Sequence, residues 1–142
     1  MSTLKLSATT RWAPRADLGR FVEVKINPAA RTAVEQSNAI VVAEAKRLCP
    51  VDTGELQNSI MSSVTEADKT IVGEIAATAP YAVYVEYGTG IRGAGSAGAG
   101  PGPYSATWAG MVAQPFMRPA LDAARKAVMD SFASNIAVAL RP

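Results

Sequence analysis

The chain contains no histidine and a single cysteine, Cys49, among its 142 residues. Histidine is the usual general base of enzymes and the commonest metal ligand, so its absence removes most familiar catalytic and metal-binding arrangements. A lone cysteine can form neither an internal disulfide nor a cysteine-based zinc site, and it is typical of a chain that folds in a reducing cytosol. We therefore predict a protein that is not an enzyme, with no catalytic residue, no metal site and no cofactor.

Charge is also scarce and nearly balanced, with a formal net charge of +2. Nucleic-acid binders usually concentrate far more positive charge on one surface. A nucleic-acid module that uses Arg11, Arg15 and Arg20 stays as an alternative class, whose affinity would fall steeply with salt. Contact with DNA in the channel of an assembly is compatible with this composition but is not indicated by it. Residues 1–20 lack a central apolar run, so we expect neither a signal peptide nor a membrane anchor.

Aromatic residues make up only 6% of the chain, although 49% of it is hydrophobic and much of that is alanine. This composition predicts a modest, helix-rich core, and the length predicts one domain. We divide the chain into an N-terminal arm, residues 1–26, and a single α+β domain, residues 27–142. A Gly-rich loop, residues 88–113, is inserted in that domain. Alternating apolar residues over 21–26 predict a short strand at the end of the arm.

Residues 27–48 are expected to form an amphipathic helix. Asn27 is suited to cap the helix and Pro28 to occupy its first turn, while Pro50 prevents continuation beyond about Leu48. Its apolar stripe is Val34, Val41, Ala45 and Leu48, whereas Asn38 falls on another side. A second helix is expected to begin near Pro119, with the stripe Leu121, Val128, Phe132, Ile136 and Leu140, in which Ala124 fills the gap.

Two β-like runs, residues 56–64 and 70–77, lie between these helices and predict an antiparallel hairpin. Residues 80–87 fit either a strand or a short helix, and we favour the helix. The order predicts an α+β fold in which a small antiparallel sheet is packed by two main helices. The loop that follows is too rich in glycine to pack a core of its own.

Two short motifs suggest enzymes. Asp52-Thr53-Gly54 is spelled like the motif of aspartic peptidases, in which two aspartates share a proton, and such a peptidase built on Asp52 is the contrasting alternative. The same residues are ordinary turn chemistry, which we favour because a helix precedes them. Residues 88–93 match the G-x-G-x-x-G spelling of a dinucleotide fingerprint, but no helix follows to receive a pyrophosphate.

Three phrases occur together at characteristic separations: CPVDTGELQNSI at residues 49–60, YAVYVEYGT at residues 81–89 and QPFMRPAL at residues 114–121. Their conjunction resembles the bacteriophage tail-component family of long-tailed phages, also described as head-tail joining or tail-completion proteins. The resemblance implies a structural virion protein, a tail-terminator-like subunit that forms a ring, expected to be hexameric, at the head-proximal end of the tail. It implies partners as well: further copies of the chain, the tail tube protein and the head connector or stopper protein.

The resemblance also implies roles for three groups of residues, each of which packing within the subunit would explain equally well. The turn from helix to hairpin is held by Pro50, Val51, Asp52, Thr53, Gly54 and Leu56. The loop departs at Tyr81, Tyr84, Glu86, Tyr87, Gly88 and Thr89. The second helix starts at Gln114, Pro115, Phe116, Arg118 and Pro119.

The Gly-rich loop is the element that we expect to face a partner, because aromatic and other apolar residues in it have no evident place in the core. The candidate contacts are Arg92, Tyr104, Trp108 and Met111, and a disordered surface loop is the alternative. The resemblance leaves a head-side neck or stopper protein open as the second structural reading. Either role places the protein in the virion, and in the host cytoplasm during assembly.

Overall fold

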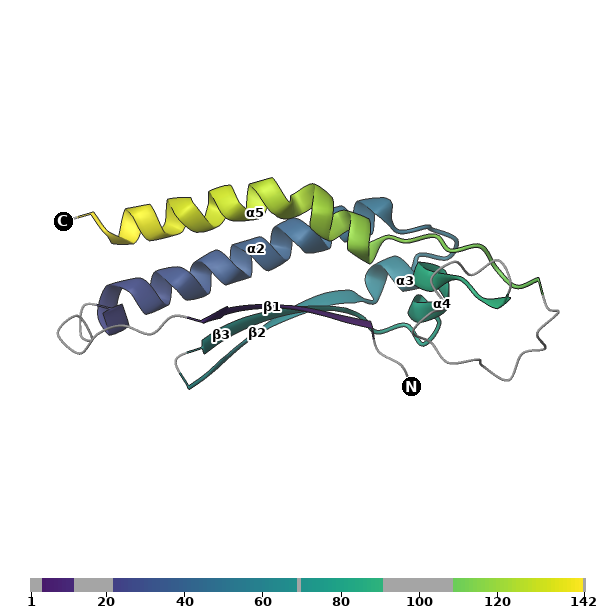
Figure 1. Cartoon of the computed structure of the whole chain (residues 1–142), viewed down its shortest axis with the longest axis horizontal. Helices are drawn as coiled ribbons and strands as arrows, with labels where there is room; N and C mark the ends of the chain where they lie inside the picture. The colour runs from purple at the N-terminus through teal and green to yellow at the C-terminus, as the bar shows by residue number, and fades with distance from the viewer. Residues whose placement is uncertain (1–3, 12–21, 69, 91–108, 142) are drawn as a thin grey trace.

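The computed structural model describes residues 4–11, 22–68, 70–90 and 109–141 (Figure 1). Its elements in chain order are β1 (Leu4–Arg11), the π-helical turn η2 (Val22–Ile26), α2 (Asn27–Leu48), α3 (Glu55–Asn58), β2 (Ile60–Ala67), β3 (Thr70–Ala77), α4 (Ala82–Tyr87) and α5 (Met117–Ala139). The predicted α+β class is confirmed: the chain combines two long helices with a small antiparallel sheet, and of the two helices it is α2 that packs on the sheet.

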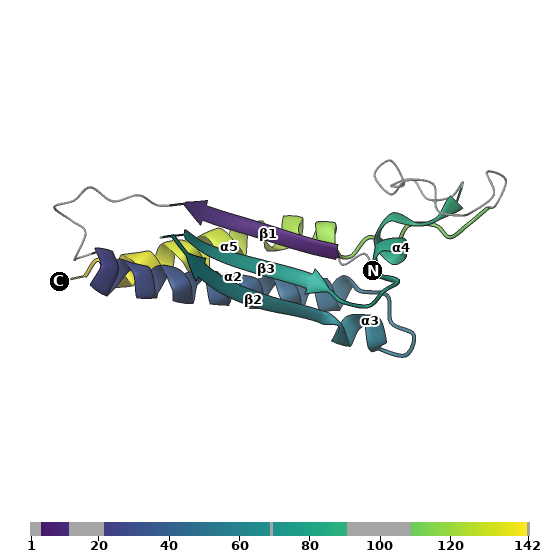
Figure 2. The same cartoon turned by 90° about the horizontal axis from the view of Figure 1, so that it is seen from below.

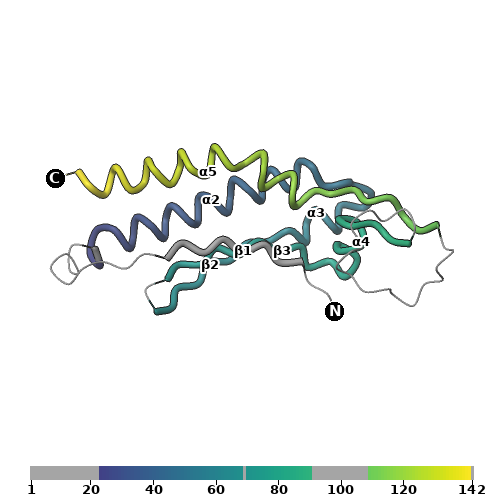
Figure 3. The backbone as a smooth tube through the Cα atoms, in the orientation of Figure 1, coloured from purple at the N-terminus to yellow at the C-terminus, as the bar shows by residue number. Residues whose placement is uncertain are grey.

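The sheet has the strand order β1-β3-β2, and both outer strands run antiparallel to β3. Helix α2 covers β2 and β3, and α5 packs chiefly on α2, on the side away from the sheet (Figures 1 and 2). The two helices run side by side in opposite directions (Figure 3). Within the described residues, no helix is long and apolar enough to cross a membrane.

The N-terminal part of the chain differs from the prediction. The strand expected over residues 21–26 is wrong for Val22–Ile26, which forms η2 and leads directly into α2; Phe21 lies outside the described residues. A helical turn buries Ile26 and leaves Val24 exposed, so the apolar alternation does not mark a strand here. The division of the chain at residue 27 stays a prediction, but Leu4–Arg11 of the expected arm forms a strand of the sheet.

Helix α2 has the predicted bounds, with Pro28 in its first turn and Cys49 in an extended conformation before Pro50. Asn27 makes no capping hydrogen bond, because η2 continues into the helix from the preceding residues. The outward placement of Asn38 is wrong as well. Its side chain is buried and Asn38 Nδ2 donates to the carbonyl of Ser63 at 3.0 Å, so the helix-to-sheet contact includes a satisfied polar group.

Gly73 on β3 makes the space that Asn38 occupies. A Cβ at this glycine would lie 2.5 Å from Asn38 Oδ1 and 2.7 Å from Val34 Cγ1. Real Cβ atoms do not approach other atoms so closely, so glycine allows α2 to sit close to the sheet at this point.

The first predicted β run begins too early. Residues 55–58 form the single turn α3, and β2 starts at Ile60. The reason is the left-handed Gly54, with φ +84°, which turns the chain so that Leu56 and Ile60 both enter the core. Strand β3 has the predicted bounds, β2 extends through Ala67, and the favoured short helix over 80–87 is confirmed as α4.

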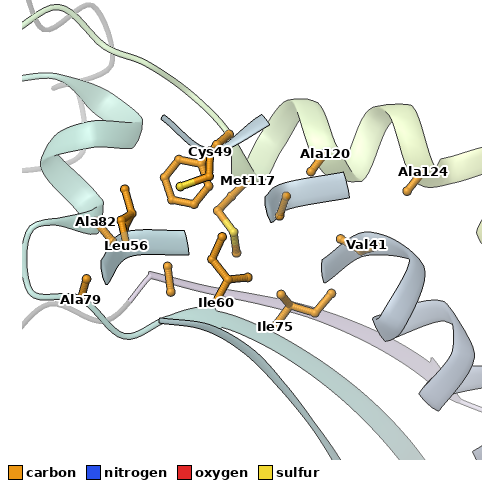
Figure 4. Close-up of a cluster of buried hydrophobic side chains, with 13 residues drawn as sticks. Val41, Cys49, Leu56, Ile60, Ile75, Ala79, Ala82, Met117, Ala120 and Ala124 are labelled. Carbon is orange, nitrogen blue, oxygen red and sulfur yellow. The ribbon is translucent and has the colours of Figure 1, made fainter. Parts of the chain in front are cut away.

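The largest fully buried side chains are Phe116, Ile60 and Met117. Ile60 and Met117 point toward each other between the sheet and α5 (Figure 4). Helix α5 contributes Ala120 and Ala124 to this core. The predicted α5 stripe is right for Ala124, which is buried, and for Val128, Phe132 and Ile136, which are half-buried. It is wrong for Leu121 and Leu140, which are exposed. Small alanines allow α5 to approach α2 closely, and in the first turns of α5 the buried position is Ala120 rather than Leu121.

Candidate functional site

The three sequence motifs lie far apart in the chain but converge at one end of the molecule, where α3, α4 and the start of α5 meet (Figure 1). The shared core there includes Cys49 and Leu56 from the first motif, Ala82 from the second and Phe116 from the third. Burial of these residues explains why the motifs occur together: each supplies one wall of the same packed unit.

Glu86 connects the second motif to the third. Glu86 is 2% exposed, and Glu86 Oε2 accepts from the backbone N–H of Phe116 at 2.8 Å and of Met117 at 2.9 Å. Glu86 Oε1 accepts from the N–H of Arg118 at 3.1 Å. Pro119, next in the chain, has no N–H to satisfy. The first turn of α5 is thus capped by a buried acid thirty residues earlier in sequence, where a negative charge also complements the helix dipole.

The ends of the Gly-rich loop are joined to each other. The N–H of Thr89 donates to the carbonyl of Met111 at 2.9 Å, and the N–H of Met111 donates to Thr89 Oγ1 at 3.0 Å. The N–H of Gln114 also donates to the carbonyl of Val85 at 2.8 Å. A Cβ at Gly110, where φ is +66°, would lie 1.8 Å from the carbonyl oxygen of Thr89. The loop therefore leaves and returns at one fixed point, and glycine is required for the approach.

Two tyrosines of the second motif contact the other motifs. The ring of Tyr87 lies under the Arg118 guanidinium, 4.7 Å from ring centroid to Cζ, a cation–π contact. The Tyr81 hydroxyl donates to Glu55 Oε2 at 3.4 Å. Partial burial and the neighbouring Glu55 carboxylate raise the pKa of Tyr81, so this hydroxyl stays protonated and able to donate.

The turn motif is mostly on the surface. Val51, Asp52 and Thr53 are exposed, and Thr53 Oγ1 accepts from the N–H of Glu55 at 3.4 Å. Pro50 is half-buried behind them. An exposed aspartate in a turn between two helices fits the turn chemistry of this motif.

Several apolar side chains at this end stay exposed even though the motifs around them are well packed. They are Val51, Tyr81, Tyr84, Met111 and Val112, exposed by 37 to 61%. Of the four predicted partner contacts, Met111 is among them, while Arg92, Tyr104 and Trp108 lie outside the described residues. Exposed tyrosine and methionine are enriched where proteins bind other proteins.

The chemistry available in the described residues is limited. No group of three or more cysteine, aspartate or glutamate side chains there could hold a metal ion. Burial raises the pKa of the Cys49 thiol, which keeps it protonated and a poor nucleophile. The arrangement suits binding by shape and apolar contact.

Sequence reasoning named Glu86 as part of the loop departure but missed its contact with α5. One signal was present: Pro119 lies near the start of a helix that has no serine, threonine, asparagine or aspartate before it, so its cap had to come from elsewhere. The burial of Asn38 carried no comparable signal, because it depends on the glycine opposite.

A family model described as "Bacteriophage HK97-gp10, putative tail-component" matches residues 13–88, slightly more than half of the chain. The match includes the turn motif and nearly all of the loop-departure motif, and the start of α5 lies beyond it. No curated protein and no solved structure matches the chain.

Proposed function

Because the chain belongs to the HK97-gp10-like family of bacteriophage tail components, we propose that it is a tail-completion subunit. It assembles into a ring, hexameric by the family resemblance, at the head-proximal end of the tail and joins the tail tube to the head connector. Membership of the family makes the protein a structural part of the phage tail and so of the virion. The ring, its position and its partners are the proposal.

The observation that supports it is the contrast at the motif end of the molecule. Three motifs are used to fix the start of α5 and the base of the loop, yet Tyr84 and Val112 beside them remain 44 and 56% exposed. A rigid base with exposed apolar side chains is what a docking surface needs, since pre-organisation reduces the entropy lost on binding. No catalytic turnover is required for this role.

Position in the particle is the decisive test. Tails that assemble without heads should contain the protein at the end opposite the tail tip, where gold-labelled antibody would reveal it. Capsids that assemble without tails should lack it. The opposite distribution, protein on capsids and none on tails, would identify a head-side neck or stopper protein and overturn the proposal.

The surface is tested by Tyr84→Asp, with Met129→Asp on α5 as the matched control, because Met129 is 66% exposed and lies away from the motifs. Both variants should fold with unchanged far-UV spectra. We expect Tyr84→Asp particles to accumulate as separate heads and tails, while Met129→Asp particles join normally. Normal joining of the Tyr84→Asp particles would show that this end of the subunit does not dock.

A further inference from the structure

We propose that neighbouring subunits of the ring pair through their sheets, with β1 of one copy adding to β2 of the next. This inference rests on the proposed ring and names the contact that builds it. It starts from the strand order β1-β3-β2, which leaves β2 at an edge of the sheet with a neighbouring strand on one side only (Figure 2).

The outer edge of β2 offers unpaired backbone groups. The N–H of Thr78 donates to the carbonyl of Ser59 at 3.1 Å. In an antiparallel pair this bond means that Ser59 and every second residue after it point their backbone groups toward β3. By the continuous register of β2 on β3, the backbone groups of Ile60, Ser62, Val64 and Glu66 point the other way. These are the groups that an added strand would pair with.

Strand β2 has little that protects this edge, because its one charged residue is Glu66 near the end of the strand. Soluble proteins usually blunt an edge strand with proline, lysine, a bulge or a short strand. Strand β2 is eight residues long, has no proline or lysine, and stays in register without a bulge. Its side chains are mostly serine, threonine and small or apolar residues, and those of Met61, Ser62, Ser63 and Thr65 are exposed. Such an edge is suited to pair with another strand.

The other edge of the same sheet is the matching partner. Strand β1 is also eight residues long, and Leu4 and Ile60 both lie opposite Ala77, while Arg11 and Ala67 both lie opposite Thr70. The two edges are therefore level, and both run antiparallel to β3, so they point in the same direction. A rotated copy can place its β1 alongside β2 as a parallel strand, a head-to-tail contact that closes into a ring when the rotation closes.

Charge favours this pairing over a contact between two identical edges. The charged residues of β1 are Lys5 and Arg11, and the only charged residue of β2 is Glu66. The Glu66 carboxylate lies 3.5 Å from Arg31 of α2 but its side chain remains 43% exposed. Pairing β1 with β1 would bring only positively charged residues together, whereas pairing β1 with β2 would not.

Cysteine crosslinking tests the contact directly. Ser7 and Ser63 both lie opposite Glu74, on either side of β3, so within one chain they are two strand spacings apart, roughly 9–10 Å. A disulfide cannot span that distance. The double variant Ser7→Cys/Ser63→Cys should therefore crosslink only between copies, giving a ladder of oligomers on oxidation. Pairs staggered by two residues, such as Ser7→Cys/Thr65→Cys, are included, and a ladder from any of them supports the contact.

The single variants are the controls. Neither Ser7→Cys nor Ser63→Cys alone should crosslink, and wild type, whose Cys49 is buried, should not either. Dimers from Ser63→Cys alone would mean that two β2 edges meet, which overturns the inference.

A second measurement uses Ser62→Pro, which removes one outward N–H, against Ser62→Ala, which keeps it. Association should be lost only in the proline variant.

The outcomes separate this inference from the proposed function. If native mass shows a ring but none of the cysteine pairs crosslinks, the proposed ring stands and the sheet edges do not build it. If the purified protein is monomeric, the oxidation is carried out on assembled particles, where a missing ladder overturns the contact. Absence of the protein from tails would overturn the proposed function itself.

Discussion

The two ends of the α2–α5 pair are held in different ways. At the start of α5, Phe116, Met117 and Ala120 are almost fully buried and Glu86 caps the helix. At its other end, Val138 and Leu140 are 63 and 56% exposed. There the contact with α2 includes Gln36 Oε1, which accepts from Asn135 Nδ2 at 2.8 Å and from Ser131 Oγ at 3.2 Å.

This difference in burial indicates which end of the α2–α5 pair is rigid in the isolated subunit. Stability within a domain is graded, and regions with few buried apolar contacts open at lower free energy than the core. The motif end should behave as the core of the subunit, and the far end of α5 should fray first. The predictions below test that gradient, from the largest expected effect to the smallest.

Phe116→Ala should cost the most. The side chain is fully buried, and large-to-small changes of this kind cost about 3–5 kcal/mol in free energy of unfolding. Phe132→Ala is the matched control on the same helix, where the side chain is only half-buried and we expect a loss of about 1–2 kcal/mol. Urea denaturation of both variants gives the comparison. Equal losses would contradict the gradient.

Glu86→Gln should come second. The amide keeps the size of the side chain but loses the charge and points an NH₂ group at backbone donors, so part of the cap is lost. Hydrogen bonds to charged groups contribute about 1.5–3 kcal/mol each to stability, and we expect a loss in that range. Glu35→Gln, which affects only an exposed pair with Arg31, should change stability by less than about 0.5 kcal/mol. Amide exchange at Met117 and Arg118 should quicken in the first variant alone.

Gly110→Ala tests the hydrogen-bonded contact between the two ends of the loop, at Thr89 and Met111. Left-handed backbone alone costs an alanine about 1–2 kcal/mol, and Gly54→Ala, where the added Cβ meets only Asn58 Nδ2 at 3.8 Å, should show that cost. At Gly110 the Cβ also meets the carbonyl of Thr89, so the loop ends must separate as well. Hydrogen exchange at Thr89 and Met111 should rise for Gly110→Ala and not for Gly54→Ala. Unchanged hydrogen exchange at Thr89 and Met111 in Gly110→Ala would show that the two loop ends accommodate the added methyl group without separating.

Gln36→Ala should have the smallest effect. It removes the acceptor shared by Ser131 and Asn135 at an exposed site, where a hydrogen bond contributes only about 0.5–1.5 kcal/mol. Loss of stability should fall at the low end of that range, with faster amide exchange confined to the last turns of α5. A global loss as large as that of Phe116→Ala would mean that the far end is as rigid as the motif end.

Local signals in the sequence predicted much of the fold. Pro28 and Pro50 mark the ends of α2, and the alternation through Ile71 and Ile75 gave β3 its bounds. The start of the first hairpin strand could not be read in the same way, because Leu56 and Ile60 are both buried, one from a helical turn and one from a strand. Strand β1 was missed because its pairing with β3 is a long-range contact.

The candidate site was predicted in parts. The three motifs named residues that the structure brings to one end, and their common packing gives a physical reason for their occurrence together. Sequence could not show that Glu86 faces the N–H groups of Phe116 and Met117, because that contact depends on how α4 docks against α5. Nor could it show which apolar residues stay exposed, since Tyr84 and Phe116 belong to equally apolar motifs.

The sequence by itself determined the class of fold, the family and the turn chemistry, because proline, glycine and apolar periodicity act on the nearest residues of the chain. Only the tertiary structure decided that an acid on α4 caps α5, that Gly73 admits Asn38, and that the two edges of the sheet are level. These features arise from residues far apart in sequence, and their positions are fixed only when the elements pack together.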